Sequence, residues 1–208
     1  VRLAGNGGGY AYGVMGATHH ALEDYGTLLA LQGLRVFVPA FAADVTELVK
    51  RLMEFDGPAY LRLGRCELPA GFSLPPYAAF RRLLEGGNAT MVVTGPLAGG
   101  ILARFQQLPL ERRPALWVLT ELPVLPTDLP AALLRDLAQS QHLFVVEEHV
   151  ATGVVGQMLS HALALVGAAP RRFTHHCARG YLSGRYGSQV FHRAECGLDP
   201  DSLLAALS

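Results

Sequence analysis

The stretch that decides the fold is Gly5–Asp24, GNGGGYAYGVMGATHHALED, near the start of a chain of 208 residues. It follows the short segment Val1–Ala4, which we expect to be a strand. A strand that runs into a glycine cluster indicates a turn where the backbone approaches another group closely. No Gly-Lys-Ser/Thr follows, and a tyrosine stands where G-x-G-x-x-G requires its third glycine, so neither nucleotide-binding loop fits.

The composition is that of a well-buried α/β protein. Hydrophobic residues make up 50% of the chain and charged residues 16%. The net charge is zero, which argues against a nucleic-acid or anionic-membrane partner. No apolar run reaches the roughly 18 residues needed to span a bilayer, and no signal peptide is visible. Cys66, Cys177 and Cys196 are widely spaced, which predicts reduced thiols in a cytoplasmic protein.

The first third of the chain alternates strand and helix patterns. We expect a helix capped by Thr18 and running to about Gln32, a strand over 34–38, and an amphipathic helix over 45–53. A further strand over 59–63 delivers Gly64 and Arg65 at its carboxyl end. This order predicts a parallel sheet with ligands outside the carboxyl ends of its strands.

A second α/β unit is expected after a linker. The segment 66–88 is rich in proline and glycine and includes one short helical pattern around 77–84. The predicted domains are therefore 1–65, the linker 66–88, and 89–208. In the last of these, strands are expected at 90–94, 115–120, 143–146 and 172–175, and helices at 98–106, 129–139, 153–166 and 199–207.

Five side chains raise the question of a metal site: His19, His20, His175, His176 and Cys177. Adjacent histidines on a helix point about 100° apart, and no H-x-x-x-H or C-x-x-C spacing is present. The pattern therefore favours surface or capped histidines over a bound transition metal.

Glu147-Glu148-His149 follows a buried strand and could act as an acid–base group. Alternation along a strand sends the two carboxylates to opposite faces, which favours a scaffold role for Glu147.

His19 is the stronger candidate for chemistry. It adjoins the glycine turn and is expected at the start of a helix, where the positive potential lowers the pKa of an imidazole. The alternative is a histidine that bonds only to its own loop.

The chain resembles thiamine diphosphate enzymes of the transketolase family. Residues 13–20, GVMGATHH, match a G-x-x-G-x-T/S-H turn, and residues 56–65, DGPAYLRLGR, match a D/G-P-x-x-x-R strand. The run 143–149, LFVVEEH, with Gly153 and Gly156 after it, is similar to a segment of the family's C-terminal domain. The resemblance implies an α/β fold: the later half of a parallel-sheet pyrimidine-binding domain, followed by a second, transketolase C-terminal-like α/β domain.

The resemblance also implies an activity. A transketolase-like transferase moves a two-carbon ketol unit between sugar phosphates, and thiamine diphosphate performs the carbanion chemistry. By this resemblance His19 is a catalytic residue that also binds substrate hydroxyls, and Arg65 binds the sugar phosphate. Two positions depart from the family pattern: Met15 stands where an Asp reads a sugar hydroxyl, and Gly7 where a His is found.

The resemblance leaves part of the site outside these residues. The glutamate that activates the cofactor, the aromatic residues against its pyrimidine, and the Mg²⁺ ligands precede the first matched strand in this family. The chain also begins without Met, inside an expected strand, which suggests missing N-terminal residues or cleavage. We therefore expect an N-terminal partner subunit or domain, a homo- or hetero-oligomer such as a dimer, and no metal ligands in this chain.

Two alternatives stay open from the sequence. One is a protein similar to 1-deoxyxylulose-5-phosphate synthase or to the beta subunit of a 2-oxo acid dehydrogenase. The other is a non-catalytic dimerisation module that has kept the fold.

Overall fold

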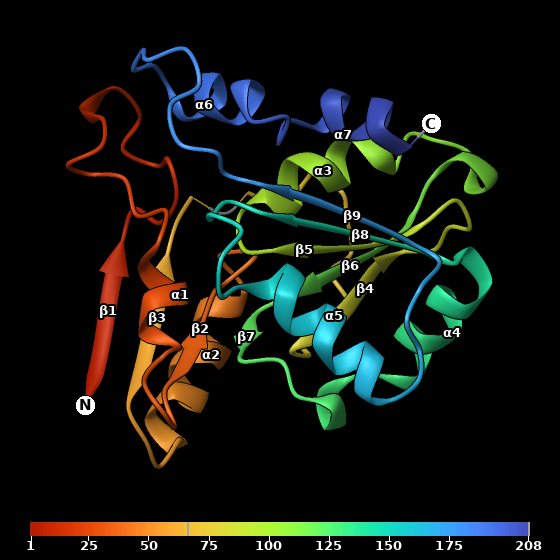
Figure 1. Ribbon diagram of the computed structural model, residues 1–208, viewed down its shortest axis with the longest axis horizontal. Coiled ribbons are helices and arrows are strands. Elements are labelled where there is room, and N and C mark those ends of the chain that lie inside the picture. The colour runs from red at the N-terminus through yellow and green to blue at the C-terminus, as the bar shows by residue number, and fades with distance from the viewer. Residues whose placement is uncertain (66, 208) are drawn as a thin grey trace.

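The structure is a computed structural model that describes residues 1–65 and 67–207. Its strands form two sheets, which lie side by side with helices around them (Figure 1). Cys66 lies outside the described residues, and Cys177 and Cys196 are free thiols. The predicted α/β class is confirmed by these mixed sheets and helices.

The first sheet is built mostly from the start of the chain. Its strands and the neighbouring helices are β1 (Arg2–Asn6), α1 (Asp24–Leu28), β2 (Arg35–Phe37), α2 (Asp44–Glu54), β3 (Ala59–Leu63) and β7 (Glu121–Leu122). The strand order is β1-β3-β2-β7. β1, β3 and β2 run parallel, as the alternating pattern predicts, and β7 joins antiparallel from the second half of the chain.

The second sheet has the order β4-β6-β5-β8-β9. Its strands are β4 (Phe80–Leu84), β5 (Thr90–Thr94), β6 (Ala115–Leu119), β8 (His142–Glu147) and β9 (Arg172–Cys177). The helices of this part are α3 (Leu97–Phe105), α4 (Ala131–Ser140), α5 (Val155–Leu165), α6 (Gln189–Glu195) and α7 (Pro200–Leu207). Short 3-10 turns are η1 (Gly13–Met15), η2 (Leu110–Arg112) and η3 (Pro126–Asp128). β4 is antiparallel to β6, and the other neighbours are parallel.

Helices cover both faces of the second sheet. α3 and α7 lie on one face, and α4 and α5 on the other (Figure 1). Neighbouring residues of β5 therefore enter different cores: Met91 packs with the first pair of helices and Val92 with the second. Parallel strands that are covered on both faces have continuous apolar sequences. For this reason β5, β6 and β8 could be predicted from the sequence.

The helix predicted from Thr18 to about Gln32 is wrong in its extent. Helix α1 begins at Asp24 and ends at Leu28. Upstream of it, the N–H groups of His19 and His20 both donate to the Gly16 carbonyl, which makes a turn and not a helix. The tertiary pairing of this segment, described below, overrides its local helix signals.

The helical pattern predicted around 77–84 is also wrong. Residues Phe80–Leu84 are strand β4, which pairs with β6 at the edge of the second sheet. Part of the expected linker thus belongs to this sheet. The amphipathic helix at 45–53 is confirmed as α2, but Val49 and Met53 of its predicted apolar face are exposed.

A buried ion pair joins the two parts of the chain. Asp44, at the start of α2, accepts hydrogen bonds from the N–H groups of Ala40 and Phe41. Its other carboxylate oxygen lies 2.7 Å from Nη2 of Arg81 on β4, and both side chains are buried. A buried charge is tolerated only with such partners, so this pair fixes α2 against the second sheet.

Within the described residues, no helix is both long and apolar enough to cross a membrane.

Replacing Asp44 with Ala leaves the Arg81 cation buried without its partner. We expect Asp44→Ala to lower the free energy of unfolding by about 3–5 kcal/mol. Glu47→Ala is the matched control on the same helix, because Glu47 pairs with Arg51 in an exposed i,i+4 contact. That change should cost less than about 0.5 kcal/mol. Urea denaturation of the two variants measures both values, and equal losses would contradict the role of the buried pair.

Candidate functional site

The glycine cluster hooks over the carboxyl end of β3. The N–H groups of Gly7 and Gly8 both donate to the Leu63 carbonyl, at 3.0 and 3.1 Å. Gly9 and Ala21 then exchange two backbone hydrogen bonds, which close the base of a loop over residues 10–20. Compact surface loops with joined ends of this kind frequently carry function.

Glu148 anchors the base of this loop to the second sheet. Its carboxylate accepts hydrogen bonds from the Tyr10 N–H at 3.0 Å, from Gln189 Nε2, and from Arg193 Nη2 at 2.6 Å. The carboxylate lies so close to Gly9 that a Cβ there would be 2.5 Å from Glu148 Cδ. Gly9 also has φ +69°, so only glycine fits at this contact.

An aromatic cluster buries the inner side of the loop. The Tyr10 ring stacks on His192 with centroids 4.8 Å apart, and its hydroxyl donates to the Gly180 carbonyl. His20 donates from Nε2 to the Gly13 carbonyl and accepts at Nδ1 from the Tyr181 hydroxyl. Burial lowers the pKa of His20, so the neutral ring required by these two bonds is favoured.

Arg62 of β3 lies behind the loop and is buried. Its Nε donates to Asp24, and its Nη2 donates to the carbonyls of Ala21 and Glu148. Burial lowers the pKa of the Arg62 guanidinium, but Asp24, Tyr25 and Glu148 together outweigh this effect, so the pKa of Arg62 is raised. The hydrogen bonds of the Arg62 guanidinium thus connect the first sheet, the loop and the end of β8.

Glu147, the last residue of β8, and Glu148, which follows it, face opposite sides, as predicted. Glu147 accepts from the Tyr25 hydroxyl at 2.6 Å, from the Gly156 N–H and from His175 Nε2 at 2.7 Å. Glu148 faces the glycine loop instead. Both carboxylates are buried, and each accepts several hydrogen bonds from within the chain. The scaffold interpretation of Glu147 therefore fits the structure, and an acid–base role does not.

His19 lies in the exposed part of the loop and not at the start of a helix, where the sequence predicted it. Its Nδ1 is 2.9 Å from the Thr18 hydroxyl. Its ring meets the edge of Tyr12, with centroids 5.9 Å apart and planes at 64°. Nε2 makes no hydrogen bond to any residue that the structure describes.

Arg65 is exposed just beyond β3, and makes no hydrogen bond or ion pair within residues 1–65 and 67–207. It lines a hollow of about 360 Å³ together with Asn6, Gly7, Ala11, Tyr12 and Gly64. This hollow lies outside the carboxyl ends of β1 and β3, where ligands bind to parallel sheets. Tyr12 thus has Arg65 beside it in the hollow and His19 against its ring.

Sequence reasoning assigned no role to Tyr12. The available signal was an aromatic residue in a glycine-rich loop that also carries His19. Sequence alone could not show that its ring faces the same hollow as Arg65, because the two residues are brought together by the β1–β3 pairing.

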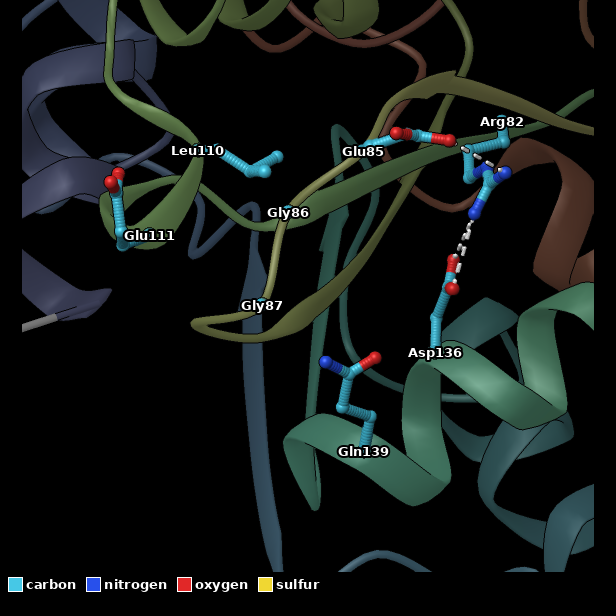
Figure 2. Close-up of a pocket in the computed structure, with 8 residues that line it drawn as sticks. All are labelled: Arg82, Glu85, Gly86, Gly87, Leu110, Glu111, Asp136 and Gln139. Atoms are coloured by element: carbon cyan, nitrogen blue, oxygen red, sulfur yellow. Dashed lines mark hydrogen bonds and ion pairs between the residues drawn. The ribbon is translucent and has the colours of Figure 1, made fainter.

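A second hollow, of about 410 Å³, lies at the amino ends of β5 and β6 (Figure 2). Arg82 contributes the cation there, but Asp136 and Glu85 both bind it at 3.2 Å. The internal pairing leaves this cation little free capacity for an anionic ligand. Its position, at the end of the sheet opposite to the glycine loop, is also not where α/β sheets bind ligands.

No group of three His, Cys, Asp or Glu side chains in the described part of the chain is arranged to hold a metal ion. His175 bonds to Glu147, and His176 Nδ1 lies 3.0 Å from the Gly197 carbonyl. His19 and His20 face different surroundings, as their contacts above show.

Comparison with known proteins adds to this geometry. A family model described as "Transketolase, pyrimidine binding domain" matches residues 2–70. The chain is 28% identical over 173 residues to an apulose-4-phosphate transketolase subunit of Phocaeicola vulgatus, covering 79% of this chain and 53% of that protein. It is 26% identical over 211 residues to the protein of the same name from Actinobacillus succinogenes, covering 98% of this chain and 66% of that protein.

Together these matches support a protein of the transketolase-family C-terminal type. Among solved structures it is similar to one described as "Split gene transketolase, inactive beta4 tetramer", with a TM-score of 0.76 and 25% identity. That match covers 100% of this chain and 65% of the other. The transketolase family generally depends on thiamine diphosphate. The chain spans about half to two thirds of the length of the two named relatives.

Four buried or half-buried histidines predict how the free energy of unfolding depends on pH. Burial lowers the pKa of His20, His142, His149 and His176. The unfolded chain therefore takes up protons near pH 6.5 that the folded chain resists. The free energy of unfolding should fall as the pH decreases through 6.5 towards the lowered values.

His149→Gln tests one of these groups. His149 accepts the Gly26 N–H at Nε2, so protonation there would break a buried bond beside Arg62. The variant should lose less stability than the parent between pH 7.5 and 5.5 in urea denaturation. His161→Gln on the exposed side of α5 is the control and should follow the parent. An unchanged slope for His149→Gln would contradict the assignment.

Proposed function

We propose that this chain is the C-terminal part or subunit of a transketolase-like enzyme that transfers a two-carbon ketol unit between sugar phosphates. The observation that carries the proposal is the position of Tyr12, which lines one hollow with Arg65 outside the carboxyl ends of β1 and β3 and contacts the His19 ring. A ring nitrogen, a phenol and a cation without internal partners suit a polar, phosphorylated ligand. Two relatives whose names include a sugar phosphate support the same substrate class.

His19 is the proposed catalytic residue of this chain and also a substrate ligand. Its Nδ1 is engaged by Thr18, which leaves Nε2 to bond a hydroxyl of the sugar. Because the ring is exposed at the rim of the loop, it can reach a substrate without rearrangement of the buried base.

Arg65 is the proposed ligand of the sugar phosphate. A guanidinium keeps its charge at every physiological pH and presents a planar set of donors that matches phosphate oxygens. Arg65 differs in this respect from Arg62, which is already occupied by Asp24 and two carbonyls.

Thiamine diphosphate is the proposed cofactor, and when bound it supplies the carbon nucleophile and electron sink for the transfer. The glycine loop would contribute polar side chains near the cofactor, and the described residues hold no group of metal ligands. We therefore assign the Mg²⁺ ligands and the diphosphate site to an N-terminal partner subunit or domain. The chain then works in a homo- or hetero-oligomer, such as a dimer, in the cytoplasm.

We also retain the division into a pyrimidine-binding part over 1–65, a connecting segment 66–88 and a C-terminal domain over 89–208. The two sheets support this division with two exceptions: β4 of the connecting segment joins the second sheet, and β7 of the C-terminal part joins the first.

Reconstitution tests the proposed function directly. We expect ketol transfer from a ketose phosphate to an aldose phosphate when this chain is combined with a transketolase-type diphosphate-domain chain from the same organism. Transfer should require both chains, thiamine diphosphate and Mg²⁺. Full activity of this chain alone would refute the need for a partner. Consumption of pyruvate in place of ketol transfer would favour the synthase or dehydrogenase alternative, and no turnover with no cofactor binding would favour a dimerisation module.

Substitutions in the active assembly test the two proposed residues. His19→Ala should lower kcat/KM by about 10- to 100-fold through loss of hydrogen bonds to the substrate. Arg65→Ala should raise the KM for sugar phosphates by a similar factor and leave that for unphosphorylated sugars unchanged. Arg104→Ala on α3 removes an exposed cation paired with Asp201, so it is the matched control and should have no effect. Equal losses with phosphorylated and unphosphorylated sugars would contradict the role of Arg65.

A further inference from the structure

The ring of Tyr12 occupies the space above Gly7. A Cβ at Gly7 would lie 2.1 Å from Cε2 and 2.5 Å from Cδ2 of Tyr12. Gly7 also has φ +83°, a conformation that side-chain-bearing residues rarely adopt. The glycine therefore makes room for the ring, and Gly7 is buried beneath it. This close approach explains why a flexible glycine loop holds one of its aromatic residues in a defined place.

The other side of the ring is open. Tyr12 is 40% exposed, although it is a large aromatic residue held against backbone. Its hydroxyl makes no hydrogen bond to any residue among those the structure describes. Tyr10, two residues earlier, has the opposite arrangement: it is fully buried, and its hydroxyl donates to the Gly180 carbonyl. Tyr10 therefore supports the fold, whereas Tyr12 presents a phenol that has no partner among the described residues.

Near the phenol of Tyr12 lie a guanidinium and an imidazole Nε2 that have no partner among the described residues. Arg65 lines the same hollow, and His19 meets the ring edge with centroids 5.9 Å apart. Asn6 adds an amide to the lining. Ligand sites typically combine an aromatic wall with a few polar groups that fix orientation. A tyrosine provides both at little cost in conformational entropy, because its body is apolar and its tip is polar.

We propose that Tyr12 is a specificity-determining residue of the sugar phosphate site. The ring forms the wall against which the carbon chain of the sugar packs, and the phenol forms a hydrogen bond with one sugar hydroxyl. Arg65 holds the phosphate at one end of the same hollow. Tyr12 therefore selects among sugar phosphates by the configuration or position of that hydroxyl. This inference rests on the function proposed above.

The test uses the active assembly of this chain with its diphosphate-domain partner. The kcat/KM is measured for xylulose 5-phosphate and fructose 6-phosphate as donors, and for ribose 5-phosphate and erythrose 4-phosphate as acceptors. Tyr12→Phe removes the hydroxyl alone and should change the ratio between two of these sugars by about fivefold, the value of one hydrogen bond. Tyr12→Ala should lower kcat/KM for all of them by about 10-fold or more, mainly through KM.

Tyr186→Phe is the matched control, because Tyr186 is exposed and packs over Gly16 outside the hollow. It should leave every ratio unchanged. A purely structural Tyr12 would lower the melting temperature and reduce activity with all sugars in equal proportion, without a change in ratio after Tyr12→Phe. That result would overturn the inference while leaving the proposed function intact. A parent assembly without ketol transfer would instead refute the proposed function and the inference with it.

Discussion

The Arg62 guanidinium, buried between the two sheets, is the constraint on which the glycine loop depends. A cation out of water is stable only when its donors are satisfied, and here the partners come from three places. Asp24 begins α1, Ala21 closes the loop, and Glu148 follows β8. Each partner is needed for the charge to be buried. The charge in turn requires the helix, the loop base and the second sheet to be held in one arrangement.

This arrangement separates a fully hydrogen-bonded loop base from an exposed rim. At the base, Tyr10 and Glu148 have every polar atom of their side chains bonded within the chain. At the rim, Tyr12, His19 and Arg65 have side-chain polar atoms without partners in the described residues. Ordering a loop for a ligand costs conformational entropy, and that cost is reduced when the loop base is already fixed. In the site proposed above, the buried network therefore lowers the entropy cost of ligand binding, because it fixes the base of the loop.

The sequence was sufficient where local pattern and tertiary structure agree. β5 and β8 were predicted because both faces of a covered parallel strand are apolar, and α2 because Leu48 and Leu52 recur with helical spacing. The sequence was insufficient where a contact with a residue far away in the chain determines the local structure. β4 contains Arg81, whose charge is acceptable in a buried strand only because Asp44 lies opposite it. The segment after Thr18 leaves the helical path because Ala21 pairs with Gly9.

The same limit applied to the candidate site. His19 and Arg65 could be named from the resemblance to transketolases, whereas only the parallel pairing of β1 with β3 brings the loop of Tyr12 beside Arg65.

Gly7 and Met15, the two positions that depart from the family pattern, both contact Tyr12. Gly7 lies beneath its ring, and the N–H of Met15 donates to its carbonyl. A side chain at position 7 and the ring of Tyr12 exclude each other sterically, so a histidine at position 7 and this tyrosine conformation are alternatives. The phenol provides a neutral donor and acceptor in the region where an imidazole would otherwise stand. Met15 is exposed and adds no carboxylate. In the proposed site, choice among sugars therefore depends on a phenol, an imidazole and a cation, a donor set suited to a different pattern of hydroxyls from one read by a carboxylate.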